Sequence, residues 1–238
     1  MPPLSRLGGE TPPPATFDDG LQTLPRALAE RHADHVELGT PVVGLRERGS
    51  GYVLEADGGD AEVDEVVVTT PAPAAADLLG EVAPDAAEPL RGLTYNPLAL
   101  VHLASDADAE GFGYQVRHDE GPHTLGVTWN ASLFDREGVY TAFLGGMTDP
   151  EVLERDDEAL GDLAAAEFAE VMDEPADVLN VTRLERGFPA FDDSWDGLGD
   201  LGLPHDVTLA TNYTARMGIP SRVREAEALA ESLADTGQ

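Results

Sequence analysis

The residues best suited to bind a ligand lie near the end of the chain, where a glycine and a proline precede an amphipathic segment. Gly218 and Pro220 come just before residues 223–233, whose apolar side chains recur at the three-and-four spacing of one helix face. Proline fits a first helical turn, and glycine lets the backbone pass close to another group. The unpaired N–H groups and partial positive charge of a helix start favour an anionic or electron-rich ligand. An ordinary C-terminal helix behind a turn explains the same pattern.

The other residues give little indication of a metal site or of a catalytic nucleophile. Cysteine is absent, which excludes disulfides, thiol catalysis and iron–sulfur ligation. None of the six histidines pairs with another at a zinc-ligand spacing beside acidic partners, so we expect no metal site. Carboxylate pairs are too common here to identify a general acid or base, and no catalytic residue is assigned. The sequence has neither a G-x-S-x-G elbow nor a phosphate loop ending in G-K-[ST].

The elements that must position the C-terminal helix are strands of the α/β kind. The run Val66–Val68 predicts a strand buried on both faces, which ends at Thr69–Thr70–Pro71. The segment "DVTLATN" predicts a second strand that leads directly into the helix. Between these two regions, short β-rich segments are followed by a helix that we expect from about Pro150 to Met172.

This order of elements predicts an α/β fold with an inserted α+β domain. Residues 17–83 and 204–238 are expected to form one domain, and residues 84–203 the inserted one. Residues 1–16 are rich in proline and glycine, which predicts a disordered N-terminal segment.

The net charge of the chain limits the classes of partner that it can bind. There are 46 acidic residues against 14 basic ones, all of them arginine, for a net charge of −32. Such a surface repels nucleic acid and anionic lipid at ordinary salt, and it is typical of proteins from a salt-saturated, haloarchaeal type of cytoplasm. No apolar run approaches the length of a membrane span. We expect a cytoplasmic protein that binds no nucleic acid, with peripheral membrane contact left open.

Segments along almost the whole chain resemble the flavin monoamine oxidase and protoporphyrinogen oxidase superfamily, and within it the protoporphyrinogen oxidase branch. They are "DGLQTLPRAL", "PVVGL", "VVVTTPAPAA", "TWNASLFDREG", "FLGG", "RLERGFPAF" and "ATNYTARMGIPSRVREAEALA". The resemblance implies a partial, Rossmann-like FAD-binding domain in residues 17–83 and 204–238. It implies a substrate-binding domain of mixed sheet and helix in residues 84–203.

The resemblance also implies which residues lie beside FAD. The loop Met217–Gly218–Ile219 would pass the isoalloxazine, and the following helix would point its N-terminus at the flavin edge where negative charge accumulates. Val42 matches the position whose backbone meets the adenine side of FAD. Thr70 and Pro71 end the strand that leads toward the cofactor.

A large apolar tetrapyrrole pocket in the inserted domain is the corresponding expectation for the substrate. Its implied lining is Trp129, Phe134, Arg136, Phe143 and Phe191. Each aromatic residue would serve equally well as core. Arg136 would either hold a propionate in a bidentate pair or form an ordinary salt bridge.

The sequence departs from the family at one point, and this leaves alternatives open. Family members begin with a strand and a G-x-G-x-x-G turn for the ADP pyrophosphate, and this chain has neither. We therefore expect the C-terminal part of an FAD-dependent enzyme that oxidises a porphyrinogen to a porphyrin in haem biosynthesis. A second interpretation is a non-catalytic fragment, or a subunit that needs a partner chain carrying the N-terminal FAD-binding half. A third is a flavin amine oxidase or carotenoid desaturase relative.

Overall fold

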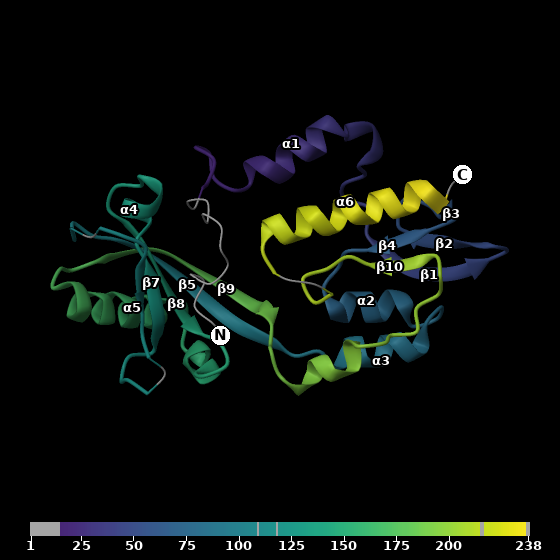
Figure 1. Cartoon of the computed structure of the whole chain (residues 1–238). Helices are drawn as coiled ribbons and strands as arrows, with labels where there is room; N and C mark the ends of the chain where they lie inside the picture. The colour runs from purple at the N-terminus through teal and green to yellow at the C-terminus, as the bar shows by residue number, and fades with distance from the viewer. Residues whose placement is uncertain (1–14, 109, 118, 215–216, 237–238) are drawn as a thin grey trace, which may run out of the picture. The chain divides into compact units, whose positions relative to one another are not determined.

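The chain divides into two compact units in a computed structural model that describes residues 15–108, 110–117, 119–214 and 217–236. Unit 1 comprises Met1–Val36 and Leu98–Arg183, and unit 2 comprises Glu37–Pro97 and Leu184–Gln238. Figure 1 labels the helices and strands of each unit.

Unit 1 is built on a five-stranded sheet with the strand order β6-β7-β8-β5-β9. The first four of these strands pair in antiparallel fashion. Two of the strands, β5 and β9, continue beyond the limits of the unit. The strands are β5 (Tyr95–Ala104), β6 (Gly113–Gln115), β7 (Thr124–Thr128), β8 (Val139–Gly145) and β9 (Asp177–Pro189).

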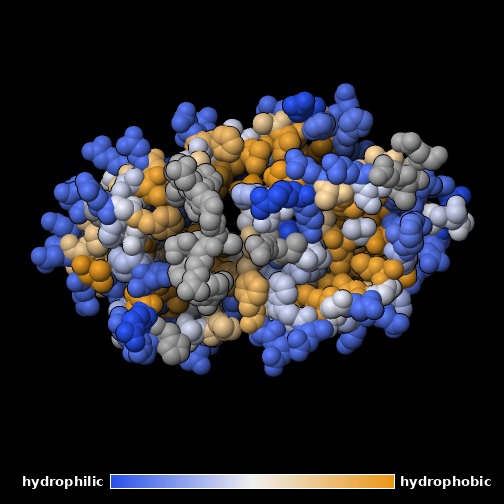
Figure 2. All heavy atoms as spheres, viewed as in Figure 1, coloured by the Kyte–Doolittle hydropathy of each residue, from blue (hydrophilic) through white to orange (hydrophobic). Residues whose placement is uncertain are grey.

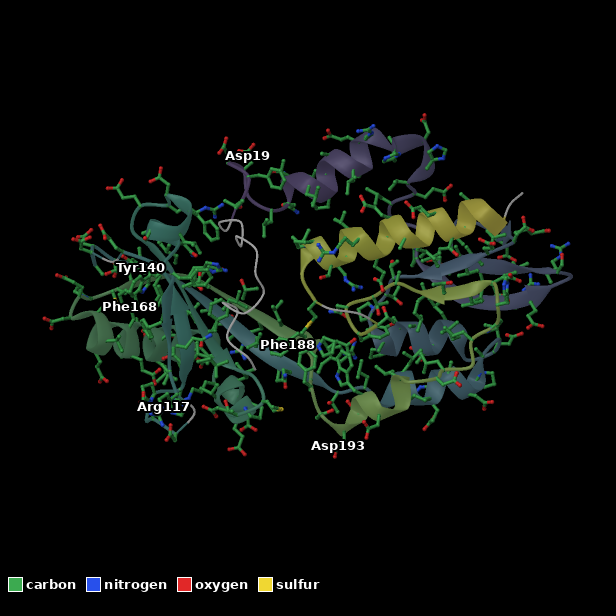
Figure 3. The ribbon with its side chains drawn as sticks, viewed as in Figure 1. Asp19, Arg117, Tyr140, Phe168, Phe188 and Asp193 are labelled. Atoms are coloured by element: carbon green, nitrogen blue, oxygen red, sulfur yellow. The ribbon has the colours of Figure 1, made fainter. Side chains whose placement is uncertain are left out.

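One face of this sheet is covered by helix α5 (Asp157–Met172), as Figure 1 shows. Strand residues alternate between the two faces of a sheet, so every second residue of β5 and β8 points toward the helix. Tyr140 of β8 meets Phe168 of α5, with ring centroids 4.9 Å apart (Figure 3). The buried residues of this core are Ala99, Val101, Leu103, Val127, Tyr140, Ala142, Leu144, Val152, Leu160, Ala164 and Phe168.

On the opposite face of the sheet, Leu100, His102 and Phe143 are partly buried, and Thr141 is buried. Leu100 of β5 lies opposite Phe143 of β8, and His102 lies opposite Thr141. The Asn130 side-chain amide donates to the Thr141 hydroxyl at 2.6 Å. This face, defined by Leu100, His102, Thr141 and Phe143, is called the open face below.

The long helix expected from Pro150 is interrupted in the structure. A 3-10 turn, η3 (Pro150–Glu154), comes first, and α5 begins only at Asp157. The Asp156 carboxylate accepts a hydrogen bond from the Ala159 N–H at 2.8 Å, which makes Asp156 the N-cap. The other helices of unit 1 are α1 (Thr23–Arg31), η2 (Ala33–His35) and α4 (Asn130–Phe134).

Unit 2 contains both strands that the sequence predicts, and the two strands pair in parallel. Strand β4 (Val66–Val68) runs beside β10 (Val207–Leu209), with Val66 opposite Val207 and Val68 opposite Leu209. The C-terminal helix α6 (Ile219–Thr236) lies along this pair in Figure 1. A separate antiparallel sheet is formed by β1 (Val42–Arg48), β2 (Gly51–Ala56) and β3 (Ala61–Val63).

The core of unit 2 explains why its limits differ from the expected domain boundaries. Helices α2 (Ala72–Leu79) and α3 (Pro84–Gly92) pack against each other and bury Leu79 and Leu90 completely. The 3-10 turn η4 (Asp193–Leu198) packs on α3, and Trp195 and Leu198 join the same core. Residues 84–97 and 184–203 therefore belong to unit 2 rather than to the inserted domain, because their apolar side chains are buried there. Helix α1 groups with unit 1.

Two absences hold for the described residues. No group of three or more His, Cys, Asp or Glu side chains among them is arranged to hold a metal ion. None of the described helices combines the length and apolar character needed to cross a membrane.

Candidate functional site

The carboxyl ends of β4 and β10 meet at one edge of the parallel pair. The Ala210 N–H, just after β10, donates to the Val68 carbonyl at 3.0 Å, so the two strands leave the pair side by side. The chain continues into Thr70–Pro71 after β4 and into Thr211 after β10. Ligands of open parallel sheets bind outside the carboxyl ends of the strands. This edge is therefore the candidate ligand-binding site of unit 2.

The Thr70 hydroxyl stands out at this edge, because its oxygen is buried and has no hydrogen-bond partner among the described residues. The backbone around it is satisfied. The Tyr213 hydroxyl donates to the Thr70 carbonyl, and the Ala72 N–H donates to the Tyr95 hydroxyl, both at 3.0 Å. Buried hydroxyl groups are almost always paired, so an orphan of this kind indicates a ligand or a water molecule.

Helix α6 is tied to the end of β10 by side chains of its own first turns. The Arg222 guanidinium donates to the Thr211 carbonyl and pairs with Glu225. Glu225 in turn accepts from the Thr214 hydroxyl at 3.3 Å. These contacts hold the helix N-terminus at the same strand ends as Thr70.

The start of α6 is open to a ligand. Gly218 has a φ of +112°, and the Ser221 and Arg222 N–H groups both donate to its carbonyl, at 3.0 and 3.2 Å. Met217 and Ile219 are exposed on either side. No acidic residue lies in the first turn, although the chain has 46 of them. The first turn of this helix therefore supplies no carboxylate to neutralise its positive end.

Tyr213, whose hydroxyl donates to the Thr70 carbonyl, is buried, with 2% of its surface exposed. Burial raises the pKa of Tyr213 to about 12, and the nearby Tyr95 hydroxyl acts in the same direction. The phenol therefore remains protonated, and a hydrogen-bond donor, throughout the neutral range.

The structure brings five of the six expected cofactor residues to this edge. Thr70 and Pro71 follow β4, and Met217–Ile219 open α6, as the sequence predicts. Val42 lies in the same unit at the start of β1, with its side chain 40% exposed. Its role at the adenine side of the cofactor stays a prediction.

The five expected pocket residues are divided between the units. Phe143 lies on the open face of unit 1, and Phe134 lies in α4. Trp129 packs against the unit 1 core, and its buried indole N–H has no partner among the described residues. Arg136 lies beside Gly20 and makes none of the ion pairs found among the described residues. Their pocket role stays a prediction.

Phe191 requires a correction, because it belongs to unit 2 and not to the inserted domain. Its ring stacks on Trp195, with centroids 5.0 Å apart, and is 64% exposed. The indole N–H of Trp195 donates to the Ala190 carbonyl, which fixes the stack to the unit 2 core.

Sequence reasoning missed three residues that the structure makes prominent. Tyr95 and Tyr213 hold the turn after β4, and His102 is a titratable group on the open face. The alternation of apolar side chains along "LALVHLAS" could have placed His102 on the less buried face of a strand. The tyrosine hydrogen bonds join residues far apart in the sequence, so no local pattern indicates them.

Comparison with known proteins defines the class of protein to which this site belongs. The family model described as flavin containing amine oxidoreductase matches residues 2–217. The chain therefore belongs to this family, and its expected cofactor, FAD, and its oxidoreductase class agree with that assignment.

Particular relatives point to one branch of the family. The chain is 27% identical over 195 residues to protoporphyrinogen oxidase 1, chloroplastic, of Spinacia oleracea, covering 73% of the chain and 34% of the relative. It is 28% identical over 220 residues to coproporphyrinogen III oxidase of Mycobacterium tuberculosis, covering 87% and 48%. The chain thus spans between a third and a half of the curated relatives that it matches.

Solved structures confirm the fold class expected from the sequence. A putative protoporphyrinogen oxidase from Exiguobacterium sp. 255-15 superposes with a TM-score of 0.73 at 24% identity, over 92% of this chain and 51% of that one. Putrescine oxidase with bound putrescine gives 0.69 at 18% identity, over 91% and 53%. At these identities the likeness shows the fold alone.

Proposed function

We propose that this chain forms the flavin-facing and substrate-facing parts of an FAD-dependent oxidase whose substrate is a porphyrinogen. One observation carries the cofactor half of the proposal. The orphaned Thr70 hydroxyl and the uncompensated N-terminus of α6 lie at the same strand ends, in a family that contains flavin. These groups offer a hydrogen bond and a positive dipole, which suit the polar edge of an isoalloxazine.

The residues of the chain then have distinct tasks. When bound, the flavin would supply the redox chemistry by accepting a hydride, that is one proton and two electrons, from a substrate carbon. The positive end of the α6 dipole would stabilise negative charge on the cofactor without rearranging, because Arg222 and Glu225 already fix the helix. Gly218 allows close approach because it has no side chain. Thr70 offers its hydroxyl, whose oxygen is shielded from water.

The substrate half of the proposal is supported by the relatives and by unit 1. Relatives from plants and from bacteria are named protoporphyrinogen oxidase and coproporphyrinogen III oxidase. The open face offers Leu100 and Phe143 as apolar contact for a tetrapyrrole, with the partly buried His102 as a polar group. We take protoporphyrinogen IX as the first substrate to test and coproporphyrinogen III as the second.

The remaining part of the FAD site is proposed to come from polypeptide beyond the present sequence, either on the same chain or on a partner chain. The support is coverage, since the matched relatives are two to three times as long as the region aligned here. The amine oxidase and desaturase alternatives have no specific observation in their favour, because the putrescine oxidase likeness concerns fold only.

Porphyrin formation is the direct test. The chain is purified in molar salt, supplied with FAD and mixed in air with protoporphyrinogen IX, coproporphyrinogen III or putrescine. The proposal predicts porphyrin fluorescence rising faster than the spontaneous rate with at least one porphyrinogen, and no peroxide from putrescine. The same assay is run after adding a polypeptide that carries the G-x-G-x-x-G region. Spontaneous rates under both conditions, or turnover of putrescine, would contradict the proposed substrate.

A further inference from the structure

The three-residue turn Thr70–Ala72 is held from both sides by tyrosine side chains. The Tyr213 hydroxyl donates to the carbonyl before Pro71, and the Tyr95 hydroxyl accepts from the N–H after it. Pro71 itself has no N–H to satisfy. The turn, Tyr95 and Tyr213 all lie in unit 2, so the arrangement belongs to one compact unit.

The Thr70 hydroxyl is the unsatisfied polar atom of this turn. Its oxygen is fully buried and has no partner among the described residues. Since both backbone neighbours are fixed, the direction of the hydroxyl is set by the turn and by one side-chain torsion. A buried group that is aimed but unpaired suits a ligand that provides the missing partner.

Tyr213 is well placed to fix the turn permanently. Its side chain is almost fully buried, and its own N–H bonds to the Thr211 hydroxyl at 3.3 Å. Burial keeps the pKa of the phenol near 12, so the donated hydrogen bond persists at neutral and moderately alkaline pH. One side chain therefore joins the loop after β10 to the turn after β4.

We propose that Tyr213, assisted by Tyr95, is a positioning residue of the flavin site, which aims the Thr70 hydroxyl at the bound cofactor by holding the Thr70 carbonyl. This inference rests on the proposed function, because it takes flavin as the ligand at the strand ends. Without the Tyr213 hydroxyl, the Thr70 carbonyl loses its donor and the turn relaxes. The Thr70 hydroxyl then loses its direction while the surrounding core remains packed.

The test is a double-mutant cycle read out as FAD affinity. The full chain is titrated with FAD in molar salt, and binding is followed by the change in flavin fluorescence. Tyr213→Phe and Thr70→Val are each expected to weaken binding by about tenfold. The double variant should be weakened by about the same factor as either single variant, because both changes remove one contact. Thr70→Ser retains a hydroxyl and should bind nearly as tightly as the wild type.

Tyr140→Phe is the matched control. Tyr140 is equally buried, and its hydroxyl also donates to a backbone carbonyl, that of Ala107, but it lies in unit 1. This variant loses the same kind of hydrogen bond, so its melting temperature should fall as in Tyr213→Phe. Its FAD affinity should not change.

The outcomes separate the inference from the proposed function. Wild-type affinity in Tyr213→Phe, or losses that multiply in the double variant, would overturn the inference and leave the flavin site standing. A wild-type chain that shows no FAD affinity, both alone and with the polypeptide that carries the G-x-G-x-x-G region, overturns the proposed site and the inference together. If Tyr213→Phe does not fold, the cycle of Tyr95→Phe with Thr70→Val replaces it, with the same non-additive result expected.

Discussion

At the scale of single residues, Gly218 decides how the backbone meets a ligand at the start of α6. Its φ of +112° is one that other residues rarely adopt, while no atom of the described residues lies within 4 Å of the point where a Cβ would stand. Backbone strain and charge, rather than space, therefore limit what can replace it. Two substitutions at this position separate these effects.

Gly218→Ala adds strain alone, which costs roughly 1–3 kcal/mol. Gly218→Asp adds comparable strain and a carboxylate at a helix N-terminus, where it stabilises the free protein. We expect Gly218→Asp to fold at least as well as Gly218→Ala but to bind FAD more weakly, as FAD titration and thermal melting would show. Gly202→Asp is the control, because Gly202 also has a positive φ and open space around it. Equal FAD affinity in the two Gly218 variants would mean that no negative charge is repelled there.

Asp192 provides a pH-dependent prediction. Hydrogen bonds from Ser194, then from Thr94, lower the pKa of this carboxyl below its usual 3.8. A lowered pKa gives stability that is present above the unfolded value and is lost as pH falls through the folded value. Asp192→Asn should therefore melt below the wild type at pH 6, with a difference that shrinks below about pH 4. Asp193→Asn, which leaves the hydrogen bonds of Asp192 in place, is the control. A pH-independent difference for Asp192→Asn would contradict the assignment.

The residues of the site were predictable only where their signal is local. Gly218 and Pro220 mark a helix start in the sequence, and α6 begins between them at Ile219. Thr70 and Pro71 follow a visible run of valines. Tyr213 was missed because its hydrogen bond joins residues 143 positions apart, which no spacing rule can detect.

At the scale of elements, α5 is the helix that holds the sheet of unit 1 together. Phe168 is fully buried against Tyr140, whereas Val171, one turn later, is 50% exposed. Phe168→Ala should lower the free energy of unfolding by about 3–5 kcal/mol, because it removes a large buried side chain and leaves a cavity. Val171→Ala should change it by less than about 1 kcal/mol. Chemical denaturation in molar salt measures both, and similar effects of the two changes would mean that α5 packs differently.

The type of each element was easier to predict than its ends. Val66–Val68 suggested a strand covered on both faces, and the structure buries Val66 and Val68 but leaves Val67 38% exposed. The helix expected from Pro150 starts seven residues later, since the Asp156 side chain caps α5. A capping carboxylate is hard to recognise in a chain where acidic residues are common.

At the scale of the whole molecule, the acidic surface makes stability depend on salt. With 46 acidic and 14 basic residues, most carboxylates can have no cationic partner. Hydrophilic side chains follow most of the rim of the face shown in Figure 2. The repulsion between carboxylates is screened over about 10 Å at 0.1 M salt and about 3 Å at 1 M. We expect the melting temperature to rise between 0.1 M and molar salt. An osmotically matched neutral sugar is the control; an equal rise in sugar would show that screening is not the cause.

The division into units could not be predicted from changes in residue pattern along the sequence. The change in texture near Pro84 suggested a boundary, but α3 packs on α2, so the chain leaves unit 2 only after Pro97. The same packing around η4 carries Phe191 into unit 2. Such boundaries depend on which core buries a segment, and this is a property of the folded molecule. The cytoplasmic location expected from the sequence stays a prediction.

The most direct test of the flavin site is the visible spectrum of the purified chain in molar salt, recorded while FAD is added. Binding at the ends of β4 and β10 predicts a shifted, structured flavin band that saturates with FAD. It also predicts that Thr70→Val weakens this binding and Thr70→Ser does not. A folded chain that leaves the FAD spectrum unchanged, alone and with the polypeptide carrying the G-x-G-x-x-G region, would contradict the assignment of this edge as a flavin site.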